Sequence, residues 1–241
     1  MKAIVCGANG AMGKLIQASL GESRIAGLVS IDGENGVPKT FEELGVCGAQ
    51  AIIDFSHHSA VGAVMDYAKA NHLAVVVGTT GHTPAEKEII FEAAKEIPVF
   101  YSGNMSLGIA VLCRLAKEAA AAFPDADIEI LEIHHNRKVD APSGTAKMLF
   151  EAVKEARPGA VANCGRSGEG KRTKDEVGIS ALRMGNVVGI HEVHICTPSQ
   201  TLTLRHEAGN RAMFADGAVA AAEFVAGKEP GLYNMEHFLN N

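Results

Sequence analysis

Tryptophan is absent from the 241-residue sequence, and aromatic residues make up only 5% of it. The core must therefore be built from aliphatic side chains, in a chain that is 47% hydrophobic. No run of about 18 uncharged apolar residues occurs, so we expect no transmembrane helix. Residues 1–5 lead into a glycine-rich segment rather than the apolar region of a signal peptide, which predicts a cytoplasmic protein.

An excess of positive charge is also absent. The chain carries 22 Lys and Arg against 28 Asp and Glu, a formal net charge of -6, and it has no run of Lys or Arg. Nucleic-acid surfaces and anionic membrane faces require clustered positive charge. We therefore expect no nucleic-acid or membrane partner, and predict a small-molecule partner instead.

Paired cysteines are missing as well. The five cysteines are odd in number, are scattered and form no Cys-x-x-Cys motif: Cys6, Cys47, Cys113, Cys164 and Cys196. This spacing argues against a disulfide framework and against a structural zinc site. We expect no metal centre, and we interpret the cysteines as small buried apolar residues.

The first hundred residues alternate between short β-branched runs and segments with helical spacing. Strands are predicted at residues 2–6, 25–30, 51–55, 74–77 and 99–101. Apolar residues recur at helical spacing between them, as at Met12, Leu15 and Ile16. Strands that are apolar on both faces and are separated by helices form a parallel sheet covered on both sides. The pattern predicts an α/β fold with a doubly wound, Rossmann-type sheet.

The pattern changes after residue 106. A helix at 106–122, a strand at 128–134 and a helix at 145–156 precede three strands without intervening helices, at 178–184, 189–197 and 200–206. Consecutive strands indicate a mostly antiparallel or mixed sheet, and hence a second, smaller α/β unit. A helix at 214–226 then returns to the first unit. We predict a dinucleotide-binding domain formed by residues 1–106 with 214–241, and a second domain at 107–213.

A glycine-rich turn, G-A-N-G-A-M-G, follows the first strand and opens into a helix. Gly7 permits the tight turn, Gly10 lets the backbone approach a pyrophosphate, and Gly13 lets helix and strand touch. Such a turn needs glycine for its own conformation too, so a purely structural role stays open. Its position in the first βα unit favours binding of NADH or NADPH.

Asp32 lies about 20 residues beyond this turn, where a dinucleotide site places an acid for the adenosine ribose. Ser30 competes for that position, and an equally simple alternative is that Asp32 only starts a turn with Gly33. No arginine follows within the turn, and Lys39 is the nearest cation after it. The sequence therefore leaves the choice between NADH and NADPH open.

Two more loops follow predicted strands at the same sheet edge. They contain glycine and small polar residues: Gly78, Thr79 and Thr80 after the fourth strand, and Ser102, Gly103, Asn104 and Met105 after the fifth. Loops at the carboxyl ends of parallel strands line the ligand crevice. Turn chemistry explains either loop alone, but their shared position favours contact with a nicotinamide ring.

The densest polar segment is E-I-H-H-N-R-K-V-D-A-P-S-G-T-A at residues 132–146. Strand alternation places Glu132 and His134 on one face, so Glu132 can reach His134 and raise its pKa, keeping a proton donor near neutral pH. Lys138 adds a second donor and a positive charge. A solvated basic turn is the simpler alternative. Zinc binding by His134 and His135 is disfavoured because adjacent strand residues face opposite ways.

A helix start ends this segment. Ser143 can cap the helix, and the amides near Gly144 and Thr145 suit an anionic carboxylate. Further along, H-E-V-H at residues 191–194 is one residue short of the zinc motif H-E-x-x-H and lies in a predicted strand. We interpret H-E-V-H as structural.

These segments, together with D-F-S at 54–56, G-T-T-G at 78–81, S-G-N-M-S-L-G at 102–108 and R-M-G-N-V-V-G-I-H-E-V at 183–193, resemble bacterial 4-hydroxy-tetrahydrodipicolinate reductases, long called dihydrodipicolinate reductases. The resemblance covers essentially the whole chain. It implies NAD(P)H-dependent reduction of 4-hydroxy-tetrahydrodipicolinate to tetrahydrodipicolinate with loss of water, in lysine and diaminopimelate biosynthesis. It also implies a homotetramer assembled through the central, substrate-binding domain.

The resemblance implies roles for individual residues. His134 matches the family's proton donor and Lys138 matches its partner. The implied contacts with the dicarboxylate substrate are His135, Ser143, Gly144 and Thr145. The implied contacts with the nucleotide are Gly7, Ala8, Asn9, Gly10, Ala11 and Met12, then Gly78, Thr79 and Thr80, and then Ser102, Gly103, Asn104 and Met105.

Two alternatives remain at this point. One is another Rossmann reductase or dehydrogenase of a small carboxylate, such as an aspartate or semialdehyde enzyme. The absence of a Ser-Cys nucleophile motif counts against the semialdehyde type. The other is a non-catalytic NAD(P)-binding regulator, which leaves the polar cluster at 132–146 unexplained.

Overall fold

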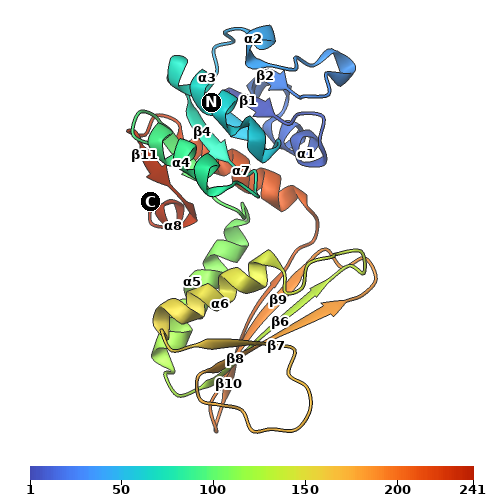
Figure 1. Ribbon diagram of the computed structural model, residues 1–241, viewed down its shortest axis with the longest axis vertical. Helices are drawn as coiled ribbons and strands as arrows, with labels where there is room; N and C mark the ends of the chain where they lie inside the picture. The colour runs from blue at the N-terminus through green and yellow to red at the C-terminus, as the bar shows by residue number, and fades with distance from the viewer. The chain divides into compact units, whose positions relative to one another are not determined.

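The computed structural model describes all 241 residues, and the chain divides into two compact units (Figure 1). The first unit consists of Met1–Ser106 and Ala212–Asn241, and the second of Leu107–Arg211. None of the helices combines the length and the apolar character that a membrane crossing requires.

The first unit contains a six-stranded sheet in which every neighbouring pair is parallel. Its strands, in spatial order, are β11 (Gly231–Tyr233), β5 (Pro98–Tyr101), β4 (Ala74–Val77), β3 (Ala51–Asp54), β1 (Ala3–Cys6) and β2 (Ile25–Val29). Strands β1, β3 and β4 are buried along their whole length, because helices cover both faces. The chain order reverses at β1, so the turn after β1 lies where such sheets bind ligands.

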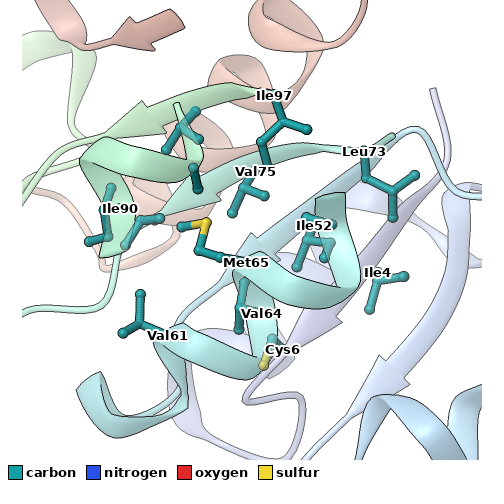
Figure 2. Close-up of a cluster of buried hydrophobic side chains, with 14 of the residues drawn as sticks. Ile4, Cys6, Ile52, Val61, Val64, Met65, Leu73, Val75, Ile90 and Ile97 are labelled. Atoms are coloured by element: carbon teal, nitrogen blue, oxygen red, sulfur yellow. The ribbon is translucent and has the colours of Figure 1, made fainter. Parts of the chain in front are cut away.

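Helices from both ends of the chain cover this sheet. They are α1 (Ala11–Leu20), α2 (Phe41–Leu44), α3 (Val61–Ala70), α4 (Pro84–Ala93), α7 (Ala212–Val225) and α8 (Met235–Leu239), with 3-10 turns at Glu22–Arg24, Glu34–Gly36 and His58–Ala60. Helix α7 contacts α1 as well as β3, β4 and β5 (Figure 1). Figure 2 shows the core under α3, where Val64 and Met65 lie among aliphatic side chains of the sheet.

The second unit contains a five-stranded mixed sheet. Its spatial order is β10 (Thr201–Glu207), β9 (Ile190–Cys196), β6 (Asp127–His134), β8 (Glu176–Arg183) and β7 (Val161–Cys164). Strand β9 is antiparallel to both β6 and β10, whereas β6, β8 and β7 run parallel. Helices α5 (Leu107–Ala122) and α6 (Gly144–Ala156) pack together and share a core with the sheet.

The predicted α/β class, with one parallel sheet and a smaller mixed sheet, is confirmed. Four short elements were not predicted: α2, β7, β11 and α8. Each spans only three to five residues, too few for a periodic pattern. Strand β11, for example, is a strand only because it pairs with β5.

The prediction that all five cysteines are buried is wrong for Cys164, which is exposed. Cys164 ends β7, an edge strand that pairs only with β8 and carries mostly exposed residues. Cys6 is buried, and the other three are half-buried. All five thiols are free.

Gly217 of α7 offers a test of how this helix packs. A Cβ at Gly217 would overlap the carbonyl oxygen of Met105, whereas a Cβ at Gly62 of α3 meets no atom within 4 Å. We expect Gly217→Ala to lower the free energy of unfolding by about 1–3 kcal/mol through overpacking. The matched change Gly62→Ala should be neutral or stabilise by about 0.5–1 kcal/mol. Urea unfolding followed by circular dichroism tests this, and equal effects of the two changes would contradict it.

Candidate active site

Glycine occupies three positions of the turn after β1, and the structural reason differs from one position to the next. Gly7 has a φ of +80°, and a Cβ there would overlap the backbone of Phe55. A Cβ at Gly13 would overlap the carbonyl oxygen of Gly7. At Gly10 the nearest atom, Gly7 O, would be 3.2 Å away, and Gly10 lines a cavity. Packing therefore requires Gly7 and Gly13, while Gly10 is the glycine over which a ligand can approach.

The backbone amides of the turn divide in the same way. Those of Gly7 and Ala8 donate to Val29 O, at 2.9 and 3.1 Å, so the fold itself uses them. The amides of Ala11 and Met12, at the start of α1, have no such partner. Helix α1 also has neither a side-chain cap nor an acidic residue in its first turn. Its positive end is thus available to an anionic group such as a phosphate.

Asp32 is fixed just beyond β2. Its Oδ1 accepts hydrogen bonds from Asn9 Nδ2 (2.5 Å) and from the Glu34 amide (3.1 Å). These two bonds, the one from Asn9 foremost, lower the pKa of Asp32. Asp32 is therefore an oriented anion at the position predicted for the ribose contact, and the side chain of Asn9 serves to hold it.

Two cavities lie along this edge of the first unit. The larger, about 980 Å³, is lined on its polar side by Gly7, Gly10, Asp32, Lys39 and Ser56. A volume at the upper end of the range for small-molecule sites suits the adenosine half of a dinucleotide. The smaller, about 210 Å³, is lined by Phe55, Ser56, His57, His58, Gly78, Thr79 and Thr80. The predicted G-T-T segment thus borders a cavity of its own.

A buried carboxylate joins two loops at this edge. Asp54, at the end of β3, is 1% exposed, and accepts hydrogen bonds from Ser56 Oγ (2.5 Å) and from Thr79 Oγ1 (2.8 Å). Thr79 is consequently buried, while Thr80 remains exposed. Asp54 was not predicted to be a site residue; its signal in the sequence is a charge at the end of an apolar strand.

The loop after β5 is held by its own side chains. Ser102 Oγ donates to Asn104 O (2.8 Å), and Asn104 Oδ1 accepts from the Ser106 amide (2.9 Å). The side chain of Met105 is buried in the core, at 2% exposure. Of the four residues predicted here, Ser102, Gly103 and Asn104 therefore lie nearer the surface than the side chain of Met105.

In the second unit, Glu132 collects hydrogen bonds from three directions. As predicted, β6 buries Glu132 and His134 on one face, and His134 Nδ1 pairs with Glu132 Oε2. Arg183 donates to both carboxylate oxygens, at 2.9 and 2.7 Å, and the Ser143 amide donates to Oε1 (3.0 Å). Burial alone would raise the pKa of Glu132, but these hydrogen bonds outweigh it and lower the pKa.

The contact with Glu132 determines which nitrogen of His134 can act. Nδ1 is occupied by the carboxylate, so Nε2 is the nitrogen left to exchange a proton with a ligand. A Cβ at Gly189 would lie 3.1 Å from Nε2, so glycine there keeps this nitrogen accessible. An imidazole oriented by a carboxylate on one nitrogen, with the other free, is the arrangement of a general acid or base.

The loop after β6 carries several cationic groups. Lys138 Nζ pairs with Asp140 (2.8 Å), and the Lys138 amide donates to His135 O (3.1 Å). Burial, and then the charge of Arg137, lowers the pKa of His135, which favours its neutral form. The positive charge beside the buried histidines thus comes from Lys138 and its neighbours rather than from His135.

Ser143 caps the N-terminus of α6, as predicted. Its Oγ accepts from the Ala146 amide (3.2 Å), which is an N-cap hydrogen bond. No acidic residue lies in the first turn, and a Cβ at Gly144 would meet no atom within 4 Å. The positive end of α6 at Gly144 therefore has space for an anionic group near Glu132.

Two models of one protein family match this chain, one after the other. Residues 1–105 match the family model for the N-terminus of dihydrodipicolinate reductase, and residues 108–239 match the model for its C-terminus. The chain belongs to the dihydrodipicolinate reductase family.

Relatives of this family align over the full length. A protein of Clostridium novyi named 4-hydroxy-tetrahydrodipicolinate reductase is 40% identical, with 100% of this chain and 98% of the relative covered. One of Caulobacter vibrioides with the same name is 41% identical, covering 99% and 97%. The fold matches a dipicolinate-bound dihydrodipicolinate reductase from Paenisporosarcina sp. TG-14, with a TM-score of 0.81 at 23% identity and 97% of both chains covered.

Two residues that contact this polar cluster have no role predicted from the sequence, Arg183 and His191. The predicted strand that contains His191 is confirmed as β9. The imidazole ring of His191 is buried, and its centroid lies 5.0 Å from the ring centroid of His134. His191 lies opposite Glu132 in the β6–β9 register. In the sequence, His191 shares the alternation of the apolar Val193 and Ile195, and this pattern could have predicted that its side chain is buried. No group of three or more His, Cys, Asp or Glu residues is arranged to hold a metal ion.

Glu132→Gln tests the role of the buried carboxylate in the second unit. The folded-state pKa of Glu132 lies below its ordinary value of 4.5, so its ionised form stabilises the fold above that pH. This contribution is lost as the pH falls through 4.5 towards the folded-state pKa. At pH 7 the variant should lose about 3 kcal/mol, because Arg183 is left without its anion.

Urea midpoints at pH 7 and pH 4 measure this difference. The difference in urea midpoint between wild type and Glu132→Gln should be smaller at pH 4 than at pH 7. Glu151→Gln, which removes an exposed carboxylate of α6, is the control and should change neither midpoint appreciably. A gap of the same size at both pH values would contradict the role assigned to the ionised Glu132.

Proposed function

We propose that this protein catalyses the NAD(P)H-dependent reduction of 4-hydroxy-tetrahydrodipicolinate to tetrahydrodipicolinate, with loss of water, in lysine and diaminopimelate biosynthesis. The observation that carries this proposal is the oriented pair of Glu132 and His134 beside the open N-terminus of α6, in a chain of the dihydrodipicolinate reductase family. A proton donor next to an anion site suits reduction of a cyclic diacid. Consumption of NAD(P)H accords with the cytoplasmic location predicted from the sequence.

We assign the dinucleotide to the first unit. When bound, NAD(P)H supplies a hydride. The start of α1 would bind the pyrophosphate, Asp32 the adenosine ribose, and the loops after β4 and β5 the nicotinamide end. The contacts assigned are Gly7, Ala8, Asn9, Gly10, Ala11, Met12, Asp32, Gly78, Thr79, Thr80, Ser102, Gly103, Asn104 and Met105. The glycine-rich turn, the unpartnered amides of α1 and the two cavities support this assignment.

We assign the dicarboxylate to the second unit. Ser143, Gly144 and Thr145 bind one carboxylate at the helix start, and His135 contacts the substrate beside them. His134 holds a proton on Nε2 and donates it as the hydroxyl group leaves, while Lys138 adds positive charge and a second donor. Dipicolinate, named with the Paenisporosarcina structure, is itself a planar diacid, which supports this substrate class.

An assay of cofactor oxidation tests the proposed function. Purified protein is mixed with NADH or NADPH, and the substrate is generated by coupled condensation of pyruvate with aspartate semialdehyde. We expect oxidation at 340 nm that requires both this protein and the condensation step. Oxidation of neither cofactor would overturn the proposal.

We further propose that NADH is preferred over NADPH. An ionised Asp32 at the ribose position repels a 2′-phosphate, whereas Lys39, which lines the same cavity, attracts one. Because Asp32 is fixed by Asn9, its repulsion should dominate. Asp32→Ser should lower the NADH to NADPH ratio of kcat/KM by about tenfold or more. An unchanged ratio would refute the assignment of Asp32 to the ribose.

His134 and Thr145 should separate catalysis from binding. His134→Gln should lower kcat by about 100-fold or more with little change in KM, because a proton donor is lost. Thr145→Val should chiefly raise KM, by about tenfold, because a substrate contact is lost. Steady-state kinetics with saturating cofactor measure both parameters. The reverse ranking would contradict the assigned roles.

We also propose a homotetramer assembled through the second sheet. Its face away from α5 and α6 carries half-buried Leu131, Ile133 and Ile190 and the 45% exposed Leu182. Sedimentation should give four times the 25.2-kDa chain mass. Leu182→Glu should reduce this mass, whereas Leu232→Glu, at the similarly exposed Leu232 (43%) of the first unit, should not. A monomeric wild type would refute the proposal.

A further inference from the structure

The two ring nitrogens of His191 have unequal surroundings. The residue is only 4% exposed and is the second residue of β9. Its Nε2 lies 3.2 Å from Ser143 Oγ, within hydrogen-bonding distance. Its Nδ1 is buried and has no hydrogen-bond partner. One ring nitrogen therefore contacts the residue that caps α6, and the other has no hydrogen-bond partner.

His191 is a neutral imidazole at neutral pH. Burial, and then repulsion from His134, lowers the pKa of His191 to about 4. A neutral imidazole carries one hydrogen, on either Nδ1 or Nε2. A buried N–H without an acceptor is rarer and more costly than a buried acceptor without a donor. The hydrogen therefore belongs on Nε2, where it points to Ser143 Oγ.

This hydrogen determines the direction of the Ser143 hydroxyl. A serine hydroxyl can accept two hydrogen bonds and donate one. Ser143 Oγ already accepts from the Ala146 amide (3.2 Å), and the His191 N–H takes the second lone pair. The backbone of Ser143 is held in turn by its amide bond to Glu132 (3.0 Å). The hydroxyl hydrogen is thus left to point at a ligand.

We propose that His191 is a positioning residue, which holds the Ser143 hydroxyl so that its hydrogen points to a substrate carboxylate at the start of α6. The identity of that carboxylate rests on the proposed function, but the direction of the hydroxyl does not. In the opposite tautomer, Ser143 donates to His191 and presents a lone pair to the anion. That arrangement would repel a carboxylate, so the tautomer of His191 controls binding.

The first test reads the tautomer directly. Ring ¹⁵N chemical shifts of histidine are recorded on the full-length protein saturated with NADH at pH 7, and His191→Gln identifies the signals of His191. We expect the hydrogen on Nε2 and a bare Nδ1. A hydrogen on Nδ1, or on both nitrogens, would overturn the inference. This test does not depend on turnover.

The second test measures binding of dipicolinate, a stable diacid, by calorimetry on the protein with NADH. His191→Leu should weaken binding about tenfold while kcat falls less than about threefold. His191→Gln should stay within about threefold of wild type, because its amide can place an N–H near the position of Nε2. His206→Leu is the matched control: His206 pairs with His191 across β9 and β10, but the hydrogen bonds of the Ser143 amide and hydroxyl are to Glu132, His191 and Ala146, so affinity should persist.

A mutant cycle with Ser143 separates positioning from packing. In a Ser143→Ala background, His191→Leu should weaken dipicolinate binding by less than about twofold, because the hydroxyl that His191 orients is gone. A full tenfold loss in that background, or equal losses in the Leu and Gln variants, would mean that the ring only fills space. If His191→Leu fails to fold, the ¹⁵N shifts decide the question. Absence of turnover would refute the proposed function. The role of His191 would then still be tested by the dipicolinate affinities.

Discussion

The second unit depends on the compensation of one buried negative charge. The Glu132 side chain is wholly removed from solvent, and an unpaired carboxylate there would cost several kcal/mol. Arg183 from β8, His134 from the same strand and the amide of Ser143 together satisfy it. Because these groups come from three elements, one carboxylate sets the positions of the sheet, the helix start and the proton donor.

The first unit also contains a buried carboxylate that is satisfied by hydrogen bonds, with fewer partners. Asp54 is buried at the end of β3, and its hydrogen bonds with Ser56 and Thr79 tie together the loops after β3 and β4. Those loops line the cavities assigned to the dinucleotide. In each unit, then, a buried acid in the last part of a strand holds neighbouring loop residues by hydrogen bonds. Flexible turns thereby gain the rigidity that a binding site needs.

Much of the site could be predicted because its signals are local. Alternation along β6 predicted that Glu132 and His134 would meet, and Ser143 caps α6 as its residue type favours. The glycine-rich turn could also be predicted from the sequence, since the positive φ at Gly7 favours glycine. The local signals did not reveal how the groups are used: the amides of Gly7 and Ala8 are bonded to Val29, which only the placement of β2 decides.

The sequence by itself determined the longer helices and strands and the class of fold, because side-chain periodicity and turn preference act over a few residues. It also determined the candidate proton donor, through the spacing of Glu132 and His134 within one strand. Only the tertiary structure decided that His191 lies opposite Glu132 and next to Ser143. The physical reason is that pairing between β6 and β9 joins segments far apart in the chain, and their register depends on the whole core that forms beneath them.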